Sequence, residues 1–417
     1  MVLKVLKLAK TTFSSQTGKD TSIVFVTTIV NIIVGGLFFI LVPRLLDTAS
    51  YGIFSTVLAT GIMASSIANL GIDTSLLHYV SKNTNEKNKF LSLALESYLV
   101  IALVVTFTGF FLSAQIAAFL NTPQTADLLK IAFLSTTLLL LVNFYTASLQ
   151  SQGKFLKASL LNIISNSIRL LSLLAAFYFF TVNLYFLTFL FFFVTVSAVI
   201  AGRIFMPFNF NLIPPKGNSD LFKFNSWIAL ALIVSSVPFD NYFLIKLAGP
   251  VQTALYAAPF KILAFSYQIG GNLTRVLGAR FSSAQNLTDV KKYSFEFLPF
   301  PILISLGLVV LAIFPHFFIQ VLFGNQYLES AQVLRILSIG SISFFLNMIP
   351  ASIILYHLSK PKVSMIITLA RYVLFVALLF MLVPQYLALG AAYAFTISET
   401  FVLVLMSAYL LKKFSAK

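Results

Sequence analysis

The chain has no cysteine, three histidines and one tryptophan among its 417 residues. The missing cysteines exclude disulfides, thiolate metal sites and a cysteine nucleophile. His78, His316 and His357 are too far apart in sequence to form a metal-ligand motif. We therefore expect no metal site and no thiol chemistry in this protein.

Charge is also scarce, because Asp, Glu, Lys and Arg together make up 10% of the residues while hydrophobic types make up 59%. A soluble domain carries about 25% charged residues. The mean hydropathy is +0.95, and phenylalanine alone accounts for 45 positions. Too little polar surface exists to cover a water-soluble globule, so the composition predicts an all-α integral membrane protein.

Long apolar runs recur along the whole chain, and a spanning helix needs about 20 such residues. They predict about twelve transmembrane helices. The runs are 21–43, 51–78, 90–120, 128–150, 158–180, 184–206, 224–247, 253–281, 293–318, 331–357, 363–383 and 386–411.

The basic residues between these runs alternate in number from one connection to the next. Alternate connections, beginning with the N-terminal segment, hold 21 of the 28 Lys and Arg residues, whereas the opposite connections hold four. Basic loops stay on the cytoplasmic side of a membrane. The pattern predicts that both termini are cytoplasmic, and it assigns the net charge of +16 to topology rather than to nucleic-acid binding.

The predicted organisation is two six-helix bundles joined by a cytoplasmic linker. Arg44-Leu45-Leu46 matches Lys246-Leu247-Ala248 at a shift of 202 residues, and Lys130 matches Arg335 at a shift of 205. An even number of helices per half makes such repeats parallel; chance similarity between apolar helices is the alternative. The predicted parts are an amphipathic N-terminus 1–20, bundles 21–206 and 224–411, linker 207–223, and a tail 412–417.

Four short motifs resemble a known family. They are Leu41-Val42-Pro43-Arg44-Leu45-Leu46 with Tyr51-Gly52-Ile53-Phe54, Leu70-Gly71-Ile72-Asp73, Ser151-Gln152-Gly153-Lys154, and Phe239-Asp240-Asn241-Tyr242 ahead of Ala254-Leu255-Tyr256. The layout resembles polysaccharide flippases of the Wzx type, in the superfamily that also holds multidrug exporters and the peptidoglycan-precursor flippase. Ala254 departs from the family, which more often has glycine there.

That resemblance implies transport of an undecaprenyl-pyrophosphate-linked oligosaccharide across the bacterial inner membrane by alternating access. The cargo would be a repeat unit of O-antigen, capsule or exopolysaccharide. A polysaccharide polymerase and a chain-length regulator would be partners, besides the membrane lipids. No cofactor, nucleic acid or catalytic residue is expected.

Charged residues within the apolar runs are the candidate site, since each costs about 2.5–3.5 kcal/mol at a helix centre on insertion scales. Asn162, Asn166 and Arg169 share one helix face, and Ser364, Thr368 and Arg371 repeat the spacing in the second half. A cationic cavity would suit an anionic cargo. The candidate substrate-binding residues are Arg169, Arg371, Lys261, Asn166, Gln268 and Asn272. The alternative is that these cations pair with acids or snorkel.

Acids within the apolar runs include Asp73, Glu96, Asp240 and Glu399. The first two lie near the expected cytoplasmic ends, where water can reach them, whereas the other two lie deeper in the membrane. Asp240 could pair with Lys261, and Glu399 with Arg371. Either carboxyl could instead carry the proton of an ion-coupled antiport cycle, because desolvation and a nearby cation shift its pKa in opposite directions. Charge pairing and ion coupling both stay open at this point.

Other function classes fit less well. A membrane glycan polymerase or ligase would need a large extracytoplasmic loop, and every predicted extracytoplasmic connection is short. No phosphate-binding glycine loop is present, which argues against nucleotide hydrolysis. A cation-coupled multidrug or other small-molecule exporter of the same superfamily is the closest alternative. The slightly basic balance inside the membrane favours an anionic cargo over it.

Overall fold

The computed structural model describes residues 16–82, 86–179, 181–207, 233–284 and 286–415. This part of the chain is helical and has no strand. Nine of its helices are long and apolar enough to cross a membrane. The predicted class, an all-α multi-pass membrane protein, is confirmed; the count of twelve spans stays a prediction.

The chain divides into two compact units. Unit 1 comprises residues 1–42 and 57–237, and unit 2 comprises residues 43–56 and 238–417. The expected N-terminal amphipathic segment lies outside the described residues up to residue 15, and the expected linker 207–223 lies outside them from residue 208. The last two residues of the predicted tail also fall outside.

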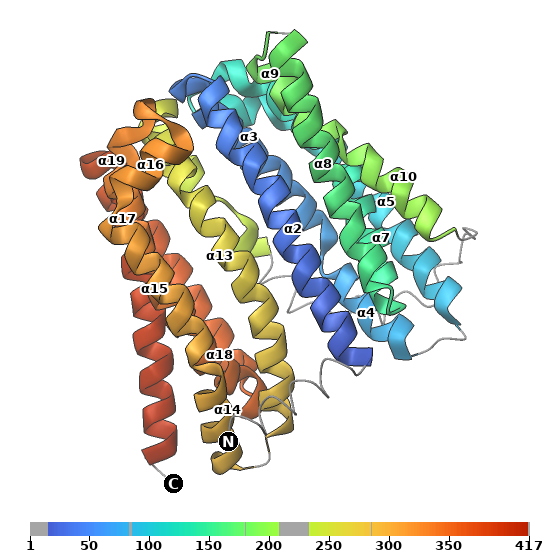
Figure 1. Ribbon diagram of the computed structural model, residues 1–417. Helices are drawn as coiled ribbons and strands as arrows, with labels where there is room; N and C mark the ends of the chain where they lie inside the picture. The colour runs from blue at the N-terminus through green and yellow to red at the C-terminus, as the bar shows by residue number, and fades with distance from the viewer. Residues whose placement is uncertain (1–15, 83–85, 180, 208–232, 285, 416–417) are drawn as a thin grey trace. The chain divides into compact units, whose positions relative to one another are not determined.

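Unit 1 follows the first six predicted runs, some of which consist of two consecutive helices. Its helices are α2 (Gln16–Leu45, up to Val42), α3 (Thr48–Asn69, from Val57), α4 (Ile72–Lys82), α5 (Lys87–Phe119), α6 (Ala126–Leu134), α7 (Thr136–Ser151), α8 (Phe155–Phe179), α9 (Leu184–Phe193) and α10 (Thr195–Phe205). Helix α7 packs against α4, α5, α8 and α10 (Figure 1). Tyr98, Phe144 and Leu149 are fully buried among these helices. In lipid such close packing, rather than water exclusion, holds helices together.

Unit 2 contains the remaining runs from Pro238 onward; the predicted run 224–247 is described only from residue 233, and its part up to Val237 belongs to unit 1. Its helices are α12 (Phe239–Leu247), α13 (Gly249–Ser283), α14 (Leu287–Phe297), α15 (Pro299–Ile313), α16 (Pro315–Phe323), α17 (Ala331–Leu346), α18 (Met348–Ser352) and α19 (Pro361–Ser415), with a π-helical turn η4 (Ile353–His357) after α18. Helix α17 packs against α13, α15 and α19 (Figure 1). Helix α12 packs against α13 and α19.

Helix α19 is two antiparallel helices rather than one. The backbone at Leu387 is not helical, with φ 54° and ψ −129°. Arg371 and Glu399, 28 residues apart, form an ion pair. A straight helix would separate them by about 42 Å at 1.5 Å per residue, so the chain must reverse between them. The reversal falls where the sequence predicts the boundary between runs 363–383 and 386–411.

The segment Pro43–Thr56 packs as part of unit 2, although it joins two helices of unit 1. Arg44 donates from Nε to the carbonyl oxygen of Leu322 at 2.9 Å and from Nη2 to that of Val321. These carbonyls lie in the last turn of α16, where no regular helical partner is available. Gln326 donates to the Pro43 carbonyl oxygen at 2.6 Å. Three polar contacts thus fix the segment in place.

The start of α3 carries its own cap inside this segment. The Asp47 carboxylate accepts a hydrogen bond from the Ser50 backbone N–H at 2.9 Å, which satisfies one of the amides left over at a helix N-terminus. Hydrogen bonds from the Ser50 side chain and backbone lower the pKa of Asp47, because they favour the charged carboxylate.

Candidate functional site

Arg169, on α8 in unit 1, is a buried cation that is 8% exposed. Its Nη1 donates to Asn166 Oδ1 at 2.5 Å, and its Nη2 donates to the Phe191 carbonyl oxygen at 3.0 Å. The guanidinium lies 4.2 Å from the centre of the Phe191 ring and 5.8 Å from that of Phe38. Two hydrogen bonds and two aromatic faces therefore hold it in one position.

The Phe191 carbonyl explains why a cation is tolerated there. Phe191 lies in the last turn of α9, and carbonyls at a helix C-terminus carry partial negative charge. Arg169 Nε, however, is buried without a hydrogen-bond partner. Among the described residues, no carboxylate lies within ion-pair distance of Arg169. The positive charge of Arg169 is thus solvated by dipoles but not neutralised.

The hydrogen bonding continues from Arg169 to a third helix. Asn166 Nδ2 donates to Asn31 Oδ1 on α2 at 2.7 Å. Both asparagines are half-buried. Arg169, Asn166 and Asn31 therefore form one hydrogen-bonded chain, which links α8 to α2 and which we call the unit 1 relay.

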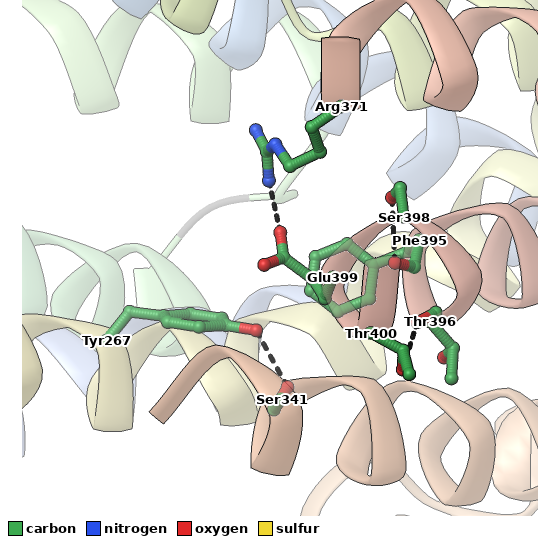
Figure 2. Close-up of polar contacts among 8 residues, drawn as sticks. All are labelled: Tyr267, Ser341, Arg371, Phe395, Thr396, Ser398, Glu399 and Thr400. Atoms are coloured by element: carbon green, nitrogen blue, oxygen red, sulfur yellow. Dashed lines mark hydrogen bonds and ion pairs between the residues drawn. The ribbon is translucent and has the colours of Figure 1, made fainter. Parts of the chain in front are cut away.

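Arg371, in the first half of α19, has a different environment in unit 2. It forms an ion pair with Glu399 in the second half of α19 (Figure 2). Only 4% of the Glu399 side chain and 20% of the Arg371 side chain is exposed. The guanidinium also lies 4.2 Å from the centre of the Tyr372 ring. Each buried charge therefore has its counter-charge in contact.

Polar residues on neighbouring helices surround this pair. Tyr267 on α13 and Ser341 on α17 are joined through their hydroxyls at 2.7 Å, beside Glu399 (Figure 2). Lys261, also on α13, lies close enough to Asp240 in the first turn of α12 for an electrostatic interaction. These groups give unit 2 two carboxylates for its two intramembrane cations.

The two arginines share a sequence spacing in the two halves but differ in charge compensation. Arg169 and Arg371 are 202 residues apart, three fewer than the shift of 205 that relates Lys130 to Arg335, so they lie about one helical turn apart in the repeat. The shift of 202 also relates Ser197 to Glu399. Ser197 carries no charge and its hydroxyl donates to the Val194 carbonyl oxygen. Glu399 thus supplies an acid in contact with Arg371, whereas no acid among the described residues of unit 1 is in contact with Arg169.

The other predicted site residues are placed as follows. Gln268 is exposed on α13 and Lys261 on the same helix is half-buried, while the Asn272 side chain lies outside the described part of the chain. Sequence reasoning missed Asn31, although an amide within the first apolar run was a visible signal. It also missed the Phe191 carbonyl, for which no sequence signal exists because every residue has one. Within the described ranges no cluster of His, Cys, Asp or Glu could hold a metal ion.

Comparison with known sequences finds a matching family and a curated relative with significant similarity. The family described as "Polysaccharide biosynthesis protein" matches residues 17–283, which is more than half of the chain. A Shigella flexneri protein described as "Putative O-antigen transporter" is 28% identical over 229 residues, which make up 50% of this chain and 54% of that protein. The chain thus spans about half the length of this curated relative.

Solved structures share the fold over nearly the whole chain. A multidrug resistance MATE family transporter of the MOP superfamily, in an inward-facing conformation, superposes with a TM-score of 0.75 at 14% identity over 93% of this chain and 95% of that one. The lipid II flippase MurJ, in an inward closed conformation, gives a TM-score of 0.74 at 14% identity over 94% and 87%. At such identities the likeness concerns the fold alone.

Proposed function

The chain belongs to the polysaccharide biosynthesis protein family, and from this premise we propose that it is a flippase for a lipid-linked oligosaccharide. The cargo is an oligosaccharide repeat unit on undecaprenyl pyrophosphate, which crosses the bacterial inner membrane by alternating access. The protein moves this molecule and does not alter it chemically. The Shigella flexneri relative, described as an O-antigen transporter, supports the cargo class.

The observation that carries this proposal is the uncompensated cation Arg169. A pyrophosphate group must leave water to cross the membrane, and an unpaired anion in a low-dielectric medium is strongly disfavoured. A fixed positive charge in the path offsets that penalty. Because no carboxylate in the described ranges neutralises Arg169, whereas Glu399 neutralises Arg371, the positive potential that an anionic headgroup needs comes from unit 1.

We propose that both termini are cytoplasmic, because the basic connections alternate throughout the sequence. The chain has no cysteine, so single cysteines can be introduced without background. Thr48→Cys in intact cells should react with a membrane-impermeant maleimide, whereas Ser415→Cys should react only after the membrane is permeabilised. The reverse labelling would contradict this orientation.

Transport should fail when the unit 1 cation is removed. Arg169→Ala in proteoliposomes should reduce the flipping rate of a fluorescent undecaprenyl-pyrophosphate-linked saccharide at least tenfold. The reason is that a lost hydrogen bond or ion contact to a charged group is worth about 1.5–3 kcal/mol, and about 1.4 kcal/mol corresponds to a factor of ten. The measurement is the initial rate at equal amounts of reconstituted protein.

Arg335→Ala is the matched control for this variant. Arg335 on α17 is half-buried, less deeply than Arg169, and like Arg169 it donates to a carbonyl of another helix, that of Ala312, at 3.1 Å. If a lost arginine-to-carbonyl contact were the whole effect, both variants would be slowed alike. A wild-type rate in Arg169→Ala would refute the role of this cation, and a wild-type protein that flips no lipid-linked saccharide would refute the flippase function.

Ion coupling stays part of the proposal, with Asp240 as the candidate carboxyl because Glu399 is held by Arg371. The proteoliposome assay also tests ion coupling. A flipping rate that does not change when proton or sodium gradients are imposed would exclude coupling. A multidrug exporter is the second candidate, supported by the MATE-like fold. If this second candidate is right, the protein should lower the susceptibility of cells to cationic drugs and should not flip a lipid-linked saccharide.

A further inference from the structure

We infer that Asn31 is the residue that presents the positive potential of the unit 1 relay to the cargo, as a hydrogen-bond donor to its anionic group. This inference rests on the proposed function. It moves the point of contact away from Arg169, which sequence reasoning selected, to a residue on another helix.

The direction of the relay is fixed by chemistry. An arginine side chain can only donate hydrogen bonds, so Asn166 must turn its oxygen towards Arg169. The Asn166 amide nitrogen then faces Asn31, which must accept the hydrogen bond with its own oxygen. The observed contacts agree: Arg169 Nη1 lies 2.5 Å from Asn166 Oδ1, and Asn166 Nδ2 lies 2.7 Å from Asn31 Oδ1. The last group in the chain is therefore the Asn31 amide nitrogen, a donor.

Arg169 itself is poorly placed to bind a large headgroup. It is 8% exposed, two of its nitrogens are engaged by Asn166 and by the Phe191 carbonyl, and aromatic rings cover its planar group. A bulky pyrophosphate could reach it only by displacing these contacts. Its charge can act at a distance, however, because successive hydrogen bonds polarise one another in a low-dielectric environment.

Asn31 is better placed for contact. Its side chain is half-buried, its nitrogen is not enclosed, and in the described ranges that nitrogen has no acceptor. Gly35, one turn further along α2, leaves the space that Asn166 occupies, since a Cβ there would lie 3.1 Å from Asn166 Nδ2. The local structure of α2 therefore brings Asn166 close while it leaves the donor of Asn31 available.

The ligand that fits this arrangement is a hydrogen-bond acceptor with negative charge. The free end of the relay offers only N–H groups, backed by a cation that no carboxylate among the described residues neutralises. A phosphate oxygen gains a charge-assisted hydrogen bond there, whereas a cationic drug would meet a donor and a repulsive potential. The relay thus selects anionic cargo, which in the proposed function is the pyrophosphate.

The test measures binding of undecaprenyl pyrophosphate and of uncharged undecaprenol to the full chain in lipid nanodiscs. Asn31→Asp keeps the oxygen that Asn166 needs but replaces the terminal donor with a negative acceptor. It should weaken pyrophosphate binding by about ten- to one-hundred-fold, the loss expected for one hydrogen bond to a charged group. Binding of undecaprenol and the melting temperature should not change.

A second variant acts on the same relay from its centre. Asn166→Asp places a carboxylate against Arg169, neutralises it and leaves Asn31 with an acceptor towards which its amide can turn. Pyrophosphate binding should fall by a similar factor, in a protein at least as thermally stable as the wild type. This variant keeps the inference testable if Asn31→Asp does not fold.

Asn183→Asp is the control for the added charge. Asn183 caps α9 by accepting a hydrogen bond from the Phe186 N–H, a role that aspartate fills equally well. Equal weakening in Asn183→Asp, or wild-type binding in Asn31→Asp or Asn166→Asp, would overturn the inference. If the wild type binds undecaprenol as tightly as the pyrophosphate, the proposed function itself fails, which is a distinct result.

Discussion

Glu399→Leu should destabilise the protein by about 3–5 kcal/mol, the usual effect of removing one partner of a buried ion pair. Glu399 is 3% exposed, so water does not screen the attraction between its carboxylate and the Arg371 guanidinium. Without it, the half-buried Arg371 guanidinium keeps, among the described residues, only the Tyr372 ring as a partner. Thermal unfolding of the purified protein in detergent should record a clear decrease in melting temperature.

The double variant Arg371→Met/Glu399→Leu separates two explanations for this loss. Replacing both charges by apolar groups of similar size is often neutral or stabilising, so the melting temperature should recover most of the way. If the melting temperature does not recover, the ion pair itself stabilises the fold beyond offsetting the cost of burying its two charges. The transport rate of the stable double variant then decides function, because a purely structural pair can be removed without loss of flipping.

The same experiment distinguishes the two units. Arg371 is neutralised by Glu399, whereas Arg169 has no carboxylate partner in the described residues. On electrostatic grounds the double variant should therefore retain more transport than Arg169→Ala. Equal loss in the two would mean that the arginines contribute alike, as the repeated sequence spacing by itself led us to expect.

Gly52→Val should detach the segment Pro43–Thr56 from the rest of unit 2. A Cβ at position 52 would lie 2.7 Å from the Pro250 carbonyl carbon and 3.2 Å from the Ala254 nitrogen. Both neighbours are backbone atoms, which cannot move aside as a flexible side chain can. Overpacking of this kind costs about 1–3 kcal/mol, occasionally more, and a lower melting temperature with reduced membrane levels should follow.

Gly307→Val is the matched control, because a Cβ at this glycine of α15 meets nothing within 4 Å. The two variants make the same change and lie in helices with the same general preference against glycine. Gly307→Val should leave the melting temperature nearly unchanged. A wild-type melting temperature in Gly52→Val would contradict the close backbone contact.

Gly52 also has a particular place in the repeat. Its counterpart at the shift of 202 residues is Ala254, and the Ala254 nitrogen is one of the atoms nearest to a Cβ at Gly52. Two corresponding positions therefore pack against each other inside unit 2. This contact gives a physical reason for a small residue at both, and it accounts for the tolerance of alanine at position 254.

The sequence by itself determined that the chain lies in a lipid membrane and which family it belongs to. Scarce charge and recurring apolar runs require lipid around the chain, and the resemblance carried by residues 41–46 and 51–54 is confirmed by the family match to residues 17–283. The sequence also selected Arg169, Arg371 and Glu399, since an ionisable residue in an apolar run is costly wherever the helix goes. These conclusions depend on residue type and spacing alone.

The tertiary structure decided which partners these residues have. It set Arg371 against Glu399 by reversing α19 at Leu387, and it assigned Pro43–Thr56 to unit 2. It gave Arg169 a backbone carbonyl and an amide chain that ends at Asn31. Sequence reasoning could not reach this result, because backbone carbonyls are the same at every position and only the packing of α2, α8 and α9 brings one of them to a buried cation.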